Sequence, residues 1–480
     1  MEETRIAFPY SDGGDRISRL QDELIHHILS FIDTKYAVQT SVLSKRWIDI
    51  WKSLPFLKFY RTSFSDVIKF IDFVDMVFIF RGDTNIQFFR VEWANSFADD
   101  NMVTMSVHRW IAHAVKYNVQ EIRIVIAQYY KLSYKIPHHL LNCKSLRKLS
   151  MQVFGNARYV DTFLPRSMNL PQLKVLCLDG LSISDVELSK RLFSSCPVLE
   201  TLDIIDCNIQ TDNQSRKLIV DSPSLKKFAY YDHCRLAQNN TTANIIKLCA
   251  PNLEDFTLKS LLRQDYSLEN CSPLSGVTFD MKISANKEDE NAETYENLPS
   301  EEIKVYAKRM MQFLGAVYMV QAMRLTPGFL EVLSQAPDLL DCQHPRLCNL
   351  RSLTLEMWFT RGCLRAITCL LEICPNINTI YIESIETNVS NVVDDDWEVG
   401  LSLIGKSSHL KFVQIEEVEG CDAELKILSF LLKNAKDLKK VFLYFRSSFG
   451  SPNKVKQVEQ FKDMLRAVPT ASSSIELVFY

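Results

Sequence analysis

"CPVLETLDI", residues 196–204, is a nine-residue phrase in which leucines and isoleucines alternate with polar residues. Eight further phrases share this pattern: "CKSLRKLSM" (143–151), "LPQLKVLCL" (170–178), "SPSLKKFAY" (222–230), "APNLEDFTL" (250–258), "LCNLRSLTL" (347–355), "CPNINTIYI" (374–382), "SSHLKFVQI" (407–415) and "AKDLKKVFL" (435–443). Most of them follow one another at 26–28 residues, with one interval of 33 and one gap of 97. Weaker copies at Leu274 and Val320 can fill the gap, and others precede the array near Ile86 and Val119.

A period near 27 with L-x-x-L-x-L in each unit is typical of leucine-rich repeats. Each phrase predicts a short strand with its apolar residues buried and the residues between them on the inner curve of a solenoid. Stretches such as 184–196 and 365–374 predict helices between the strands. Cys143, Cys196 and Cys374 precede strands, where we expect small buried residues. The predicted fold class is therefore α/β, a curved solenoid with parallel strands inside and helices outside.

Residues 15–59, "DRISRLQDELIHHILSFIDTKYAVQTSVLSKRWIDIWKSLPFLKF", predict a separate helical segment before the repeats. Three helices are expected, at about 22–30, 34–42 and 44–53, with Asp22, Thr34 and Ser44 as candidate caps. Three helices of this length cannot enclose all their apolar residues. Part of the apolar face must therefore be covered by the repeats or by another protein.

This segment resembles an F-box, whose pattern is roughly D-R-I-S-x-L-P-D-E-[IL]-L followed by A-V-x-T-S-V-L-S-K-R-W. The chain departs from the pattern at Gln21, where the family has proline, and at His27, where it usually has an aliphatic residue or cysteine. Residues 423–446 and the terminal "SSIELVFY" resemble an FBD region. The whole chain thus resembles plant F-box proteins with leucine-rich repeats and a C-terminal FBD region.

The resemblance implies that the chain binds a Skp-family adaptor and, through it, a cullin in an SCF-type ubiquitin ligase. It would recognise a target protein and perform no bond chemistry itself. We expect Ile50, Trp51 and Leu54 to face inward, and the adaptor-facing residues to be Leu20, Leu24, Ile28, Val42, Leu43 and Trp47. Two alternatives remain: the helices are only a cap on the solenoid, or the chain is a repeat scaffold without a ligase role.

The expected organisation is a flexible tail at 1–14, the F-box at 15–59, the repeats at 60–379 and FBD-like repeats at 380–480. Within the repeats, the acidic stretch 285–302 is expected to form a loop, because it is poor in apolar residues. The N-terminus lacks an apolar signal core and no apolar run is long enough for a membrane span, so cytoplasm or nucleus is the expected compartment.

Composition argues against several other functions. A formal charge of −3 disfavours a generally basic nucleic-acid binder. The thirteen cysteines include no paired C-x-x-C, so we expect reduced thiols and no metal or other cofactor. "GLSLIGKS" (400–407) fits the phosphate-loop pattern in its letters, but an acidic turn precedes it and a repeat strand follows it, the reverse of the required context. No catalytic motif is found, so the chain is not expected to be an enzyme.

The late repeats offer a candidate target-binding strip. Glu356, Glu383 and Glu416 each follow the last apolar residue of a phrase, so they should form one row on the inner face beside Tyr381 and Phe412. Such a strip suits a basic segment of a partner protein. The alternative is a row of solvated glutamates that is partly offset by Lys411 and Lys440 and serves only solubility.

Overall fold

The structure of the chain is a computed structural model, which describes residues 20–94, 100–127, 133–155, 159–212, 217–232, 245–262, 264–269, 274–284, 291–335, 346–385, 409–446, 452–472 and 474–480. The chain divides into two compact units, residues 1–173 and 174–480. The predicted tail at 1–14 and the phosphate-loop-like stretch at 400–407 lie outside the described residues.

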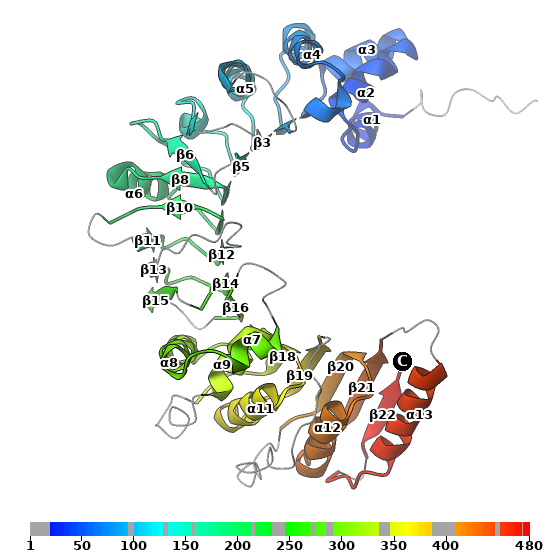
Figure 1. The fold of residues 1–480 in the computed structure, drawn as a ribbon. Helices are drawn as coiled ribbons and strands as arrows, with labels where there is room; N and C mark the ends of the chain where they lie inside the picture. The colour runs from blue at the N-terminus through cyan, green and yellow to red at the C-terminus, as the bar shows by residue number, and fades with distance from the viewer. Residues whose placement is uncertain are drawn as a thin grey trace, which may run out of the picture. The chain divides into compact units, whose positions relative to one another are not determined.

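The first unit begins with three short helices (Figure 1), which confirms the helical segment: α1 (Asp22–Leu29), α2 (Thr34–Gln39) continued by the 3₁₀ turn η1 (Thr40–Val42), and α3 (Lys45–Lys52). Asp33, not Thr34, caps α2, because its carboxylate accepts the backbone N–H of Lys35 at 2.9 Å. Ser44 does occupy the N-cap position of α3, but its hydroxyl makes no capping bond.

Repeat strands follow the helices in the first unit. The elements, in chain order, are β1 (Phe56–Tyr60), η2 (Arg61–Ser63), α4 (Val67–Phe80), β2 (Phe88–Trp93), α5 (Asp100–Lys116), β3 (Glu121–Ala127), β4 (Ser133–Lys135), η3 (Leu140–Asn142), β5 (Lys148–Phe154) and β6 (Val160–Phe163). Strands β1, β2, β3 and β5 form a parallel sheet in that order, and β4 pairs with β6. The rings of Phe70, Trp93 and Trp110 pack together between α4, β2 and α5.

The second unit is built on one parallel sheet, in the order β7 (Val175–Asp179), β9 (Thr201–Ile205), β12 (Lys227–Tyr231), β14 (Asp255–Leu261), β16 (Gly276–Lys282), β17 (Ala322–Leu325), β18 (Ser352–Met357), β19 (Thr379–Ser384), β20 (Phe412–Val418), β21 (Lys440–Phe445) and β22 (Glu476–Phe479). Every one of the nine phrases ends in a strand, and the four weaker copies lead into β2, β3, β16 and β17. Burial alternates along the strands, so the predicted inward leucines form the core.

The second layer of this unit is only partly helical. Its helices are α6 (Val186–Ser194), α7 (Ala292–Glu296), α8 (Ser300–Ala316), α9 (Pro327–Ser334), α11 (Arg361–Ile373), α12 (Asp422–Asn434) and α13 (Pro452–Arg466). Figure 1 shows α11, α12 and α13 along one side of strands β18 to β22. The prediction of helices is confirmed at 184–196 and 365–374. It is wrong in the described parts of 205–270, where short strands take their place. These are β10 (Asn208–Ile209), which pairs with β8 (Leu181–Ile183), and β11 (Lys217–Asp221), β13 (Ile245–Cys249) and β15 (Asp265–Glu269), which pair with one another.

The acidic stretch 285–302 is not a loop throughout. Residues 285–290 lie outside the described part, but helix α7 and the start of α8 fall within the rest. Ala292 and Tyr295 are buried, and the Tyr295 ring lies 5.5 Å from that of Trp358. Two apolar residues at helical spacing are therefore enough to dock this short helix despite the acidic composition. None of the described helices is long and apolar enough to cross a membrane.

Candidate protein-interaction sites

The three N-terminal helices close a small core of their own. Its members are Ile25, Leu29, Ala37, Trp47, Ile50 and Leu54, with Leu20 partly buried against it. We expected Trp47 to face a partner, but its side chain is only 5% exposed. The reason is helical spacing: Trp47, Ile50 and Leu54 lie at i, i+3 and i+7, so all three point to the same side. Ile50 and Leu54 are inward as predicted, and Trp51 is half-buried.

Large apolar side chains remain outside that core, and we call them the apolar surface: Leu24, Ile28, Phe31, Ile32, Tyr36, Val42 and Leu43. Val42 is 86% exposed and Phe31 72%. Four of the predicted adaptor-facing residues belong to it, namely Leu24, Ile28, Val42 and Leu43. Phe31 was missed, although its spacing from Leu24 and Ile28 (i, i+4, i+7) places all three along one stripe of α1 and the turn that follows.

Polar contacts hold the helices to one another and to the first strand. Arg46 Nη2 lies 2.5 Å from Asp22 Oδ1 and donates to the Leu20 carbonyl. His26 Nε2 lies 3.1 Å from the Ile50 carbonyl oxygen. The Thr34 hydroxyl accepts the backbone N–H of Lys58 on β1 at 2.7 Å. These bonds fix the helices, so the apolar surface is presented by a preformed scaffold.

The candidate strip of the late repeats is one row, as predicted. Glu356 pairs in register with Glu383, and Glu383 with Glu416, on neighbouring strands β18, β19 and β20. Tyr381 and Phe412 are exposed on the same face. Whether this row binds a target stays a prediction.

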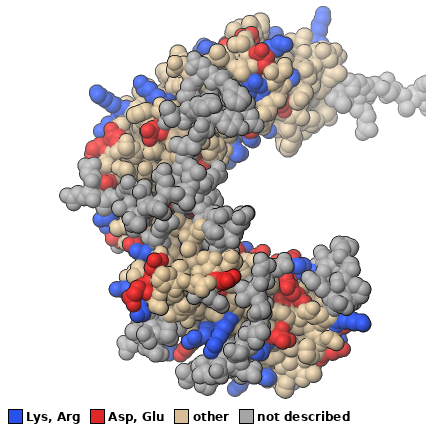
Figure 2. Space-filling model, in the orientation of Figure 1, with Lys and Arg blue, Asp and Glu red and all other residues tan. Residues whose placement is uncertain are grey.

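A cation that we did not anticipate lies against the strip. Arg324 on β17 contacts Glu356 at 2.6 Å and Glu383 at 3.2 Å. Lys440, which we expected to offset the strip, instead pairs with Glu476 at 2.7 Å. Arg324 lies within an imperfect copy of the repeat phrase, so the register that brings it beside the strip was hard to predict. On the side drawn in Figure 2, charges of both signs are interspersed over this unit.

The cysteines that precede repeat strands are part of the core. Cys143, Cys196 and Cys374 are buried, as expected for residues before the strands. Burial raises the pKa of the Cys196 thiol to about 11 and that of Cys374 to about 12, so both remain protonated. Within the described part of the chain, no group of His, Cys, Asp and Glu side chains could hold a metal ion.

Comparisons with known proteins agree with this architecture. Residues 17–59 match the F-box domain model, residues 107–272 the model "FBD-associated F-box protein At5g56370, LRR repeats", and residues 407–443 the FBD model. The chain is 28% identical to F-box/LRR-repeat protein 13 of Arabidopsis thaliana, over 98% of this chain and 97% of that protein. It is 27% identical to F-box/FBD/LRR-repeat protein At1g78750 of the same plant, over 99% and 98% of the two chains.

A helical segment with a closed core, joined to a parallel-strand repeat array, defines an F-box protein of the leucine-rich-repeat class. The match of residues 407–443 to the FBD model narrows this class to members that also carry an FBD region. The chain belongs to the plant F-box proteins with leucine-rich repeats and an FBD region.

Proposed function

We propose that this chain is the substrate-recognition subunit of an SCF-type ubiquitin ligase, acting in the cytoplasm or nucleus. The apolar surface of the F-box would dock on a Skp-family adaptor, which links the chain to a cullin, while the repeats hold a target protein. The chain would contribute no catalytic group. It would act by raising the effective concentration of the target's lysines near the conjugating enzyme.

The observation that supports adaptor docking is the exposure of Leu24 and Ile28 above a core that is complete without them. Full burial of a large aliphatic side chain is worth roughly 1.5–3 kcal/mol. Leu24 and Ile28 are each about half exposed, at 50% and 51%. Burying several such residues in a partner interface would therefore contribute substantially to affinity, whereas in the isolated chain they contact water.

The test is the double substitution Leu24→Asp and Ile28→Asp in the full chain, followed by capture of a Skp-family adaptor. We expect capture to be lost, because charges would enter a desolvated interface. The matched control is Ile68→Asp with Ile79→Asp, which changes two similarly exposed isoleucines on α4.

Both variants should retain the protected core around Trp47, as read by amide hydrogen exchange. Adaptor capture that stays within about twofold of wild type, well under a tenfold change of 1.4 kcal/mol, would contradict the proposal. A repeat scaffold without a ligase role would then be the better description.

A further inference from the structure

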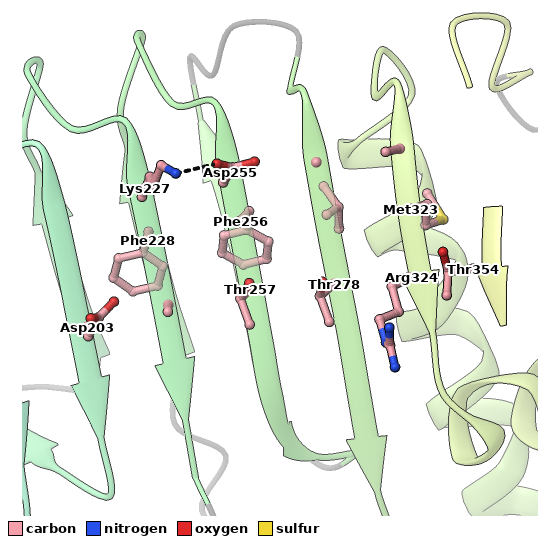
Figure 3. A pocket seen from close by; sticks show the side chains of 14 residues that line it. Asp203, Lys227, Phe228, Asp255, Phe256, Thr257, Thr278, Met323, Arg324 and Thr354 are labelled. Atoms are coloured by element: carbon pink, nitrogen blue, oxygen red, sulfur yellow. Dashed lines mark ion pairs between the residues drawn. The ribbon is translucent and has the colours of Figure 1, made fainter. Parts of the chain in front are cut away.

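A shallow groove of about 390 Å³ crosses the exposed face of the sheet in the second unit, from β9 to β18. Three of its lining residues, Ala229, Gly276 and Ala322, are small, whereas their in-register neighbours Asp203, Asp255 and Ser352 carry larger side chains. The groove follows one register row, in which Asp203, Ala229, Thr257, Thr278, Arg324 and Thr354 are successive partners. Figure 3 shows Asp203 at one end of this row and Arg324 with Thr354 at the other.

The floor of the groove offers hydroxyl groups. Thr257, Thr278 and Thr354 lie in the row and are partly exposed. The backbone groups of these strands are engaged in the parallel ladder, so a ligand must bind to side chains instead. A hydroxyl can both donate and accept a hydrogen bond. The row is therefore suited to the alternating N–H and C=O groups of a peptide backbone.

The face around the groove carries a surplus of carboxylates. Its cations are Lys227, Lys259, Lys282 and Arg324, and its carboxylates are Asp203, Asp255, Asp280, Glu356, Glu383 and Glu416. Lys227 already lies 3.3 Å from Asp255, Lys259 lies 3.7 Å from Asp280, and Arg324 contacts the glutamates described above. Six carboxylates face four cations, so two negative charges are left over.

Asp203 is the least compensated of these carboxylates. No cation of the described residues lies within 4.0 Å of it, and burial raises its pKa. A cationic group bound beside Asp203 would restore the interaction that its carboxylate has lost with water. The other end of the face offers Glu383, which contacts Arg324, and Glu416, which accepts a hydrogen bond from the Gln414 amide.

We propose that this face binds an extended, basic segment of a partner protein that crosses the strands, with one cationic side chain at Asp203 and a second at Glu383 or Glu416. Calling this partner the ubiquitination target rests on the proposed function. The groove is open to solvent along one face of the sheet. A small molecule would keep much of its surface in water there, whereas small-molecule sites bury most of their ligand.

The register sets the spacing of the two cationic groups. Asp203 and Glu383 are six strand steps apart. Neighbouring strands lie about 4.8 Å apart, so the two carboxylates are separated by about 29 Å across the strands. An extended chain advances about 3.3 Å per residue, so the two basic residues should lie about nine positions apart. Small residues between them would fit the shallow groove.

The experiment measures binding of two fluorescent peptides to the full chain in complex with its adaptor. Both peptides consist of two lysines with serine, threonine and glycine, and they differ only in whether the lysines lie nine or three positions apart. We expect the widely spaced peptide to bind about fivefold more tightly. Asp203→Asn should abolish most of this fivefold difference in affinity. Thr278→Trp should weaken the binding of both peptides, because the larger side chain would fill the groove.

Glu187→Gln is the matched control, because Glu187 is an exposed carboxylate on α6 that pairs with Lys190 away from this face. Equal binding of the two peptides, or equal loss in Asp203→Asn and Glu187→Gln, would overturn the proposal. Adaptor capture is measured on the same samples. If the two peptides bind equally while the adaptor is still captured, only the proposal of a basic segment is refuted. If the adaptor is still captured after the Leu24 and Ile28 substitutions, the proposed ligase role is refuted.

Discussion

The apolar surface of the F-box and the groove face of the repeats differ in chemistry. The first exposes Phe31, Val42 and Leu43 over three short helices, whereas the second exposes threonines and carboxylates over a broad parallel sheet. Apolar burial is non-directional and, unlike charge pairing, is not screened by salt, so it suits one constant partner. Charges and hydroxyls confer specificity and a salt-dependent on-rate, so they suit partners that are selected and exchanged.

The largest effect should separate the core of the F-box from its surface. Trp47→Ala removes a side chain that is almost fully buried and should destabilise the three helices by roughly 3–5 kcal/mol. Val42→Ala changes an exposed side chain and should cost less than about 0.5 kcal/mol. Amide hydrogen exchange of α1 and α3 measures both changes, with β18 to β20 as an internal reference. Comparable losses of protection in the two variants would contradict the division into core and surface.

A smaller effect should distinguish the two surfaces by salt. Raising NaCl from about 0.1 M to about 0.5 M shortens the screening length to a few ångströms. Adaptor capture should remain unchanged, whereas binding of the widely spaced lysine peptide should weaken by roughly fivefold. Both are measured by titration of the same complex. If adaptor capture and peptide binding were equally sensitive to salt, the difference in chemistry between the two surfaces would not govern binding.

The smallest effects concern two carboxylates close together in the chain. Hydrogen bonds from Lys174 and Lys226 hold the pKa of Glu200 below its ordinary value of 4.5. The stability from this carboxylate is therefore present above that value and is lost as the pH falls through its folded-state pKa. We expect Glu200→Gln to lower Tm slightly near neutral pH, with the difference disappearing on acidification.

Asp203 should show the opposite sign, because burial raises its pKa. The folded state then holds the proton more tightly than the unfolded chain, so the charged carboxylate carries a cost that appears as the pH rises through its folded-state pKa. Asp203→Asn should raise Tm slightly near neutral pH, although it should weaken binding of the widely spaced lysine peptide. Thermal melts of the wild type and both variants across the acidic range would show the two trends, and parallel curves would contradict them.

The repeat strands were predictable because each phrase buries its leucines by a two-residue alternation that the sequence displays directly. The same alternation predicted the row of Glu356, Glu383 and Glu416. It did not predict the irregular register after Ile415, where Glu417 has a φ of 57°. The second-layer strands at 217–221 and 245–249 were missed although "KLIVD" and "IIKLC" each end directly before a repeat phrase. Apolar runs this short do not distinguish a strand from a buried helix segment.

The F-box was recognisable from its pattern, but the orientation of Trp47 was not. A helix of eight residues makes barely two turns, so a shift of one position in its start changes which face is inward. The groove could not be predicted from the sequence for a different reason. It depends on small residues that are far apart in sequence, such as Gly276 and Ala322, lying side by side through strand register.

The bond between Thr34 and Lys58 affects how the protein should be dissected. Strand β1 pairs with β2 on one side, and on the other side the Lys58 N–H donates to the Thr34 hydroxyl while its ammonium donates to the Ser30 carbonyl. The helices thus cover an edge strand, and uncovered edges are templates for association between chains. Deleting residues 20–54 would therefore expose that edge as well as remove the apolar surface. Aggregation of such a truncated chain would imitate a loss of target binding, so point substitutions on the apolar surface are the better way to separate the two proposed functions.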